Sequence, residues 1–138
     1  MLSIEQIRPE LTWRLRREVL YPNEQLADMA MEEDNQGYHF GAFHDNALIA
    51  VVSLFQRERD WQFRKFAVVD ALQGQQVGTQ LLDYITAFVV KENGGLLWCN
   101  ARLSAIGFYN KFGFSAVGEV FHKNGFDYII MQKDIPSG

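Results

Sequence analysis

The feature that most constrains this chain is a helix-length apolar repeat that ends in a glycine pair and is followed by a short apolar run. Apolar residues recur at steps of three and four through residues 74–92, and Asn93-Gly94-Gly95 supplies a helix stop. The run 96–101 then has the length of a strand. A crossover helix that packs normally makes this strand parallel to the strand before the helix. The pattern therefore predicts a βαβ unit.

Strands and short helices are expected around this unit. Alternating side chains predict strands, and apolar residues at helical spacing predict helices. The expected strands are 1–7, 38–43, 47–55, 61–69, 115–121 and 127–133, and the expected helices are 9–19, 23–35 and one that Ser104 caps and Gly113 ends. Turns at 44–46 and 123–125 close two hairpins. The sum predicts an α+β fold of three layers, with a mostly antiparallel sheet and one parallel pair in its middle.

Length and charge exclude several classes of protein. The 138 residues, 48% of them hydrophobic, fit a single domain spanning residues 1–138. A net charge of −4 gives no basic surface for nucleic acid. Cys99 is the only cysteine, so no intrachain disulfide and no cysteine-based metal site is expected, and the cytoplasm is the expected location. The longest apolar run, 47–55, is well short of the roughly 18 residues that cross a membrane.

The segment LQGQQVGTQLL, residues 72–82, carries the clearest chemical signal. Glycines stand between the end of a strand and the start of a helix, so the unpaired amides of the first helical turn can bind an anion such as a phosphate. Neither G-x-x-x-x-G-K-[ST] nor G-x-G-x-x-G is present. Glycines that merely allow close packing of the helix on the strand are the alternative.

This loop resembles the pyrophosphate-binding signature [RQ]-x-x-G-x-[GA] of the GNAT family of N-acetyltransferases. The matching residues are Gln73, Gly74, Gln75, Gln76, Val77 and Gly78, followed by Thr79. Gln76 stands where the first signature glycine is usual. A side chain is tolerated there if it points away from the phosphates, because the contacts come from the main chain.

A second segment, ARLSAIGFYNKFGF at 101–114, resembles the family pattern A-x-x-x-Y-x-x-x-G-F, with Ala105, Tyr109, Gly113 and Phe114 in place. Arg102 replaces the Asn that is often found three residues before that Ala. GFDYIIMQK at 125–133 resembles the last strand of small members of the family. The resemblance covers residues 40–133, and both main motifs occur in the expected order.

The resemblance implies an acyl-CoA N-acyltransferase-like α/β/α fold whose central parallel strands splay apart to admit pantetheine. Acetyl-CoA would then lie along the main chain of Phe66, Ala67 and Val68, with its carbonyl at the Val68 amide. An acceptor amine would attack the thioester directly, without a metal, and Tyr109 would protonate the departing thiolate. A tyrosine on an apolar helix face is otherwise most often a core residue, and Cys99 is expected to be a small buried residue and not a nucleophile.

The residue that deprotonates the acceptor is unassigned. Many members carry a Glu on the strand before the loop, where this chain has Arg64. His122 and Glu119 are alternatives. The acids of 24–34 could attract a cationic amine, but a solvated helix face is the expected reading, as it is for Arg14, Arg16 and Arg17. The three histidines are expected on strand edges or turns.

The sequence thus predicts an acetyl-CoA-dependent N-acetyltransferase acting on a small-molecule or peptide amine, with no nucleic-acid or membrane partner and with a homodimer left open. One alternative is a catalytically weak domain that holds acyl-CoA as a sensor or scaffold. Another is a structural protein that has lost cofactor binding.

Overall fold

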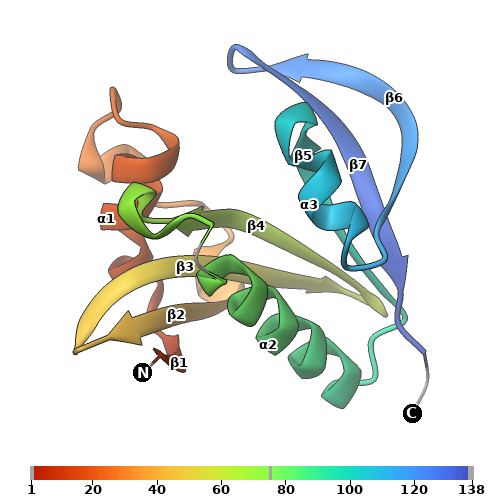
Figure 1. Cartoon of the computed structure of the whole chain (residues 1–138), viewed down its shortest axis with the longest axis horizontal. Coiled ribbons are helices and arrows are strands. Elements are labelled where there is room, and N and C mark those ends of the chain that lie inside the picture. Colours follow the sequence, from red (N-terminus) through yellow and green to blue (C-terminus); the bar gives the residue numbers. More distant parts are fainter. Residues whose placement is uncertain (1, 75, 137–138) are drawn as a thin grey trace. The chain divides into compact units, whose positions relative to one another are not determined.

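The computed structural model describes residues 2–74 and 76–136 and contains a seven-stranded sheet in the order β1-β2-β3-β4-β5-β7-β6 (Figure 1). The strands are β1 (Leu2–Ile7), β2 (Tyr38–His44), β3 (Ala47–Arg57), β4 (Asp60–Val68), β5 (Leu96–Arg102), β6 (Ser115–Lys123) and β7 (Phe126–Asp134). The α-helices are α1 (Trp13–Leu15), α2 (Val77–Lys91) and α3 (Ile106–Asn110).

The direction of the strand pairs confirms the predicted fold class. β1 with β2, β2 with β3, β5 with β7 and β6 with β7 are antiparallel. β4 and β5 are parallel and pair through Asp60–Gln62 and Leu96–Trp98. The two predicted hairpin turns form because Asp45, Asn46, Asn124 and Gly125 all adopt positive φ, the backbone region that tight hairpin turns require.

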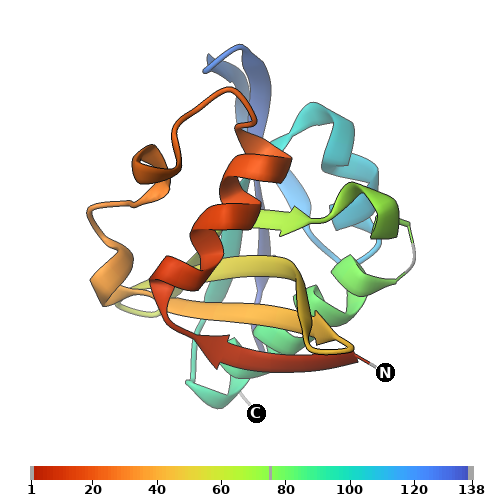
Figure 2. The ribbon, with the colours of Figure 1, turned by 90° about the vertical axis from the view of Figure 1, so that its left-hand side faces the viewer.

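The chain divides into two compact units, Met1–Phe55 with Phe63–Phe88 and Gln56–Gln62 with Val89–Gly138. In the first unit, α2 covers one face of the strands and the N-terminal helical run covers the other (Figures 1 and 2). Phe40 of β2 packs its ring against Tyr84 and Phe88 of α2, at centroid distances of 5.6 and 5.1 Å. On the opposite face, Leu15 of α1 packs with Val51 and Ala67.

The second unit shows how the predicted glycine stop ends α2. Asn93 has a φ of +60°, and the Gly94 amide donates to the Val89 carbonyl at 2.9 Å. A Cβ on Gly94 would lie 2.5 Å from the Val89 side chain and 2.7 Å from the buried Trp61 ring. Only glycine therefore allows the chain to turn this closely against the core.

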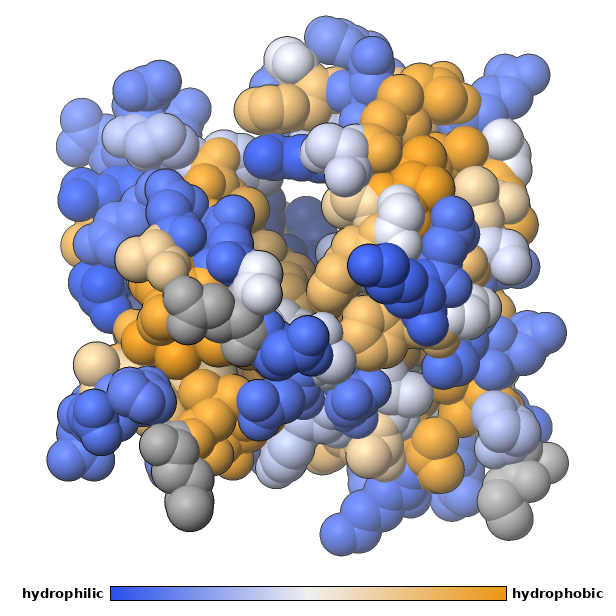
Figure 3. Space-filling view, viewed as in Figure 1, coloured by the Kyte–Doolittle hydropathy of each residue, from blue (hydrophilic) through white to orange (hydrophobic). Residues whose placement is uncertain are grey.

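The second unit also exposes apolar side chains. Leu103, Val120 and Phe126 are each more than a third exposed. Apolar atoms gather in Figure 3 over the region where Figure 1 places α3 and the β6–β7 hairpin. This end of the second unit thus leaves apolar surface in contact with solvent.

The helix predicted over 23–35 is wrong. The structure has only two short 3-10 turns there, Leu26–Met29 and Asp34–Gln36, whereas the run from Pro9 to Leu20 is helical as predicted. Asp34 does not lie on a solvated face. Its side chain is buried and pairs with Arg16, which stands 18 residues earlier in the chain. The prediction that Asp34 and Arg16 lie in solvent is therefore wrong, because the two side chains form a buried ion pair.

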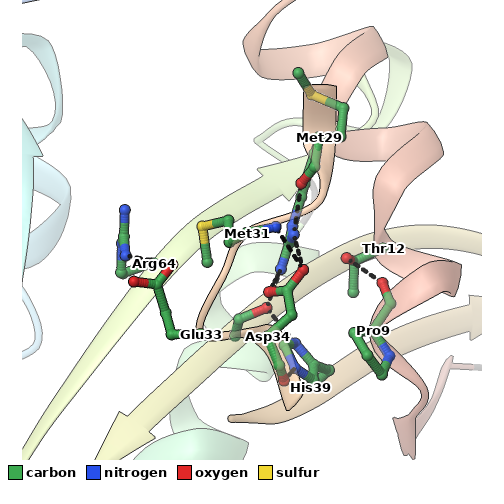
Figure 4. Close-up of polar contacts among 10 residues, drawn as sticks. Pro9, Thr12, Met29, Met31, Glu33, Asp34, His39 and Arg64 are labelled. Carbon is green, nitrogen blue, oxygen red and sulfur yellow. Dashed lines mark hydrogen bonds and ion pairs between the residues drawn. The ribbon is translucent and has the colours of Figure 1, made fainter. Parts of the chain in front are cut away.

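Arg16 connects the N-terminal run to the segment that follows it, whose Met29 and Asp34 are labelled in Figure 4. Its side chain is fully buried and donates to both Asp34 carboxylate oxygens at 2.9 and 3.0 Å, to the Met29 carbonyl at 2.9 Å and to Ser53 Oγ at 2.9 Å. Burial alone would raise the pKa of Asp34. The hydrogen bonds from Arg16 and the Met31 amide, with the charge of Arg16, outweigh burial and hold this pKa below its ordinary value.

His39 extends this buried network. It lies on β2, an interior strand between β1 and β3, and not on a strand edge or turn as predicted. Its Nε2 lies 2.7 Å from the Asp34 carbonyl, and its Nδ1 lies 2.7 Å from Ser53 Oγ. A carbonyl can only accept, so Nε2 carries the proton, and Nδ1 accepts from the Ser53 hydroxyl. Burial lowers the pKa of His39, against the opposing effect of the Asp34 carbonyl. His39 is therefore a neutral member of the network.

We expect this histidine to make the fold sensitive to mild acid. Below pH about 6.5 the unfolded chain binds a proton at this position that folded His39 resists, so the free energy of unfolding falls as pH falls, by at most about 1.4 kcal/mol per pH unit. Asp34 adds its own loss only below pH about 4, because its folded pKa is lowered. Urea unfolding at pH 7.5 and 5.5 measures the effect.

His39→Gln should flatten this dependence, since it removes the titrating ring. His44→Gln is the matched control, because the His44 side chain is 51% exposed. Equal pH slopes in wild type and His39→Gln would contradict the assignment.

Candidate active site

β4 leads into the glycine loop and changes its backbone course on the way. Lys65 has a φ of +56°, a conformation that L-residues rarely adopt within a strand. The alternation predicted for 61–69 is therefore interrupted, and the neighbouring residues Ala67 and Val68 are both buried. Phe66 lies next to Lys65, with its ring 6.0 Å from that of Phe63. The predicted pantetheine-binding residues thus form the last part of β4, after this irregularity.

The side chain of Gln73 ties the loop to the end of β4. Its Nε2 donates to the Val68 carbonyl at 2.9 Å and to the Asp70 carboxylate at 3.1 Å. Val69 follows the last residue of β4, and its amide donates to the Ile49 carbonyl at 2.9 Å. Gln73 and Val68, both predicted site residues, are therefore brought together by a direct hydrogen bond.

The loop backbone has the conformation that its glycines favour, including at the one position where a glycine is replaced. Gly74 has a φ of +82°, and a Cβ there would meet no atom within 4 Å. Gln76, which occupies the signature glycine position, has a φ of +69° and is exposed. Gln75 lies outside the described residues. A left-handed conformation is thus kept at Gln76 although the residue has a side chain.

The loop opens directly into α2. Val77 is buried and anchors the first turn, while Gly78 and Thr79 follow it in that turn. The Gln76 carbonyl accepts the first bond of the helix, from the Gln80 amide at 3.0 Å. The amides of an α-helix's first turn lack intrahelical partners and carry the positive end of the helix dipole. Residues 72–82 contain no Lys or Arg, so main-chain amides supply the positive potential here.

Tyr109, the predicted proton donor, lies in α3 of the second unit and is 9% exposed. Gly113 has a φ of +87°, and the Phe114 amide donates to the Tyr109 carbonyl at 3.2 Å, which forms the predicted helix cap. Burial, with a contribution from Cys99, raises the pKa of Tyr109. Burial also raises the pKa of Cys99 to about 12, so this thiol stays protonated.

Two charged contacts beside β4 were not predicted. Arg64 Nη1 lies 3.6 Å from a Glu33 carboxylate oxygen, and Lys65 Nζ donates to the Tyr21 hydroxyl at 2.7 Å. No spacing rule joins these residues, because each pair links β4 to the irregular N-terminal region. His122 bonds to the Asp127 carboxylate at 3.0 Å on the exposed β6–β7 hairpin.

These features define a class of fold in which a mixed sheet with a parallel pair in its middle carries an amide-rich loop between β4 and α2. The chain belongs to the GNAT acetyltransferase family, because the model of the acetyltransferase (GNAT) domain matches residues 8–135. It is 27% identical, over 98% of its length and 97% of the other protein, to an uncharacterized N-acetyltransferase of Bacillus subtilis (strain 168), YitI.

Solved structures share this fold. The ribosomal-protein-S18-alanine N-acetyltransferase of Escherichia coli has a TM-score of 0.82 at 19% identity, covering 98% of this chain and 94% of that one. A GNAT family acetyltransferase of Elizabethkingia anophelis, solved with acetyl-CoA bound, has a TM-score of 0.77 at 20% identity, covering 96% and 97%.

Two further observations concern the described residues alone. No group of three or more His, Cys, Asp or Glu side chains within 2–74 and 76–136 is placed to hold a metal ion. In the same part of the chain, no helix is long and apolar enough to cross a membrane.

We expect Gln76→Gly to stabilise the fold. Glycine adopts a φ of +69° without the steric cost of a Cβ, so the free energy of unfolding should rise by up to about 1 kcal/mol. Gln80→Gly is the matched control in the exposed face of α2, where glycine should cost about 1 kcal/mol. Urea denaturation compares the two. A loss in both variants would show that Gln76 has no left-handed strain to relieve.

Proposed function

We propose that this protein transfers the acetyl group of acetyl-CoA to a primary amine. The observation that carries the proposal is the left-handed backbone at Gln76, which keeps the form of a glycine loop ahead of α2 despite the departure in sequence. Membership in the GNAT family supports the same reaction class. The residues proposed to hold the pyrophosphate are 73–79, through their main-chain amides, and those proposed for pantetheine are Phe66, Ala67 and Val68.

The reaction joins the acceptor nitrogen to the thioester carbon. A C–N bond forms, the C–S bond breaks, and the thiolate leaves with the electron pair of that bond. The amine loses one proton and the thiolate gains one. The Val68 amide is proposed to stabilise negative charge on the carbonyl oxygen as the nitrogen attacks.

Tyr109 is proposed as the proton donor to the thiolate. Burial raises the pKa of Tyr109, so the phenol stays protonated at neutral pH and has a proton to give. The same burial makes it a weaker acid than free tyrosine, whereas a thiol has a pKa of about 8.5. Transfer of this proton is therefore uphill, so we place it after C–S cleavage, when the thiolate carries its full charge, and the proton that the amine loses returns the phenolate to phenol.

We also propose that residues 1–138 act as one domain, because the family match extends across both compact units. A cytoplasmic location is proposed from the single cysteine alone. The acyl-CoA sensor or scaffold remains the alternative function, and turnover with amines separates it from the enzyme.

Acetyl-CoA should raise the melting temperature of the protein more than ATP or NAD at equal concentration. A ligand that binds only the folded state adds about 2.7 kcal/mol of stability at 100 times its Kd. Gly78→Glu should abolish the shift, because it places a negative side chain in the first turn of α2, where the phosphates are proposed to bind.

Gly107→Glu provides the matched control for this test. Gly107 is exposed in α3, and a Cβ there meets no atom within 4 Å. This variant should keep the full acetyl-CoA shift. Normal acetyl-CoA affinity in a folded Gly78→Glu protein would place the phosphates elsewhere.

Tyr109→Phe should lower kcat by about 10²-fold while leaving acetyl-CoA affinity unchanged, because it removes a proton donor and keeps the ring. Thiol release with a working amine and binding of acetyl-CoA are measured on the same preparation. Tyr84→Phe, at a tyrosine that is 40% exposed, controls for the loss of a hydroxyl. A near-normal kcat in Tyr109→Phe would remove this residue from the mechanism.

A further inference from the structure

Arg64 lies on β4 two residues before Phe66, on a strand that leads directly into the cofactor loop. Its guanidinium lies 5.9 Å from the centre of the Phe55 ring and 3.6 Å from a Glu33 carboxylate oxygen. Figure 4 shows the Glu33 carboxylate directed toward Arg64 from the segment that the Arg16 network holds in place. Arg64 is thus positioned by an aromatic ring and one long ion pair.

Arg64 differs in hydrogen bonding from Arg14 and Arg16, two other arginines of the same unit. Arg16, fully buried, donates four hydrogen bonds. The Arg14 side chain is 53% exposed and still donates two, to Glu18 and to the Leu48 carbonyl. The Arg64 side chain is only 29% exposed, yet within the described parts of the chain it donates to no hydrogen-bond acceptor.

A guanidinium has five N–H donors in a planar fork that matches the two oxygens of a carboxylate. Partial withdrawal from water raises the free-energy gain when such an ion pair forms, and the Phe55 ring can support the flat face of the group. Glu33 sits at the edge of the same group and is itself 47% exposed, so an incoming carboxylate competes with only one long ion pair.

We propose that Arg64 binds a carboxylate of the acceptor, so that the acceptor is an amine that also carries a carboxylate, an amino acid by chemical class. The proposal rests on the acetyl transfer proposed above. Strand geometry places Arg64 within about 13 Å of Val68 along β4, at about 3.3 Å per residue. This span, shortened by the length of the Arg64 side chain, is short enough for the reacting amine and the bound carboxylate to belong to one small molecule.

The test compares each acceptor that carries a carboxylate with its carboxamide. The standard L-amino acids and 4-aminobutanoate are each assayed beside their carboxamides, by acetyl-CoA-dependent thiol release. At least one carboxylate should be acetylated with a kcat/KM at least tenfold above that of its carboxamide. Arg64→Gln should remove this preference by raising the KM of the acceptor, with the KM of acetyl-CoA unchanged. Arg64→Lys, which keeps the charge, should restore part of it.

Arg57→Gln is the matched control, because Arg57 is an exposed arginine at the end of β3. It should retain the preference of the wild type. The proposal is overturned if the wild type acetylates none of the carboxylates, if carboxamides react equally well, or if a folded Arg64→Gln protein keeps the preference. Acetylation of carboxylate-free amines would in those cases leave the acetyltransferase function standing, whereas the absence of thiol release with every amine would refute that function itself.

Discussion

The pairing of Arg16 with Asp34 is the interaction on which the first compact unit most depends. Removing a guanidinium and a carboxylate from water is costly, and the cost is offset only when geometry and further hydrogen bonds are good. Here the pair is bidentate, and Met29, Met31 and Ser53 meet most of the remaining donors and acceptors. The network holds a segment without regular secondary structure beside the sheet, and that segment presents Glu33 to Arg64.

The second constraint lies in the backbone from β4 to the start of α2. Among the described residues of this stretch, Lys65 within β4 and Gly74 and Gln76 in the loop have positive φ. The first interrupts the strand and the other two shape the loop that precedes the helix. An L-residue in this region is strained, so Lys65 and Gln76 need support from their surroundings. For Lys65 the Tyr21 hydroxyl and ring supply part of it, at 2.7 Å from the hydroxyl oxygen and 4.4 Å from the ring centre.

Local signals predicted much of this fold, and contacts between distant residues account for what they missed. The hairpin-turn residues Asp45, Asn46, Asn124 and Gly125, Asn93 after α2 and Gly113 after α3 all have positive φ, which Asp, Asn and Gly tolerate best, so their elements were predicted. The acids of 24–34 have helix-like composition, but burial of Asp34 against Arg16 decides the structure there. No pattern in the sequence links Arg64 to Glu33 or His39 to Ser53, because the fold alone brings them together.

The two sides of the proposed reaction use charge in different ways. The loop is proposed to bind through main-chain amides, whose directions depend on the sign of φ and not on the identity of each side chain, as the positive φ of Gln76 illustrates. On the proposed acceptor side the charges belong to side chains, Arg64 on β4 and Glu33 in the N-terminal region. We expect substitutions at these two positions to change which amine binds without changing the backbone of the loop. On this proposal, acceptor choice in the fold changes at a few charged side chains, and in this chain the decisive one is Arg64.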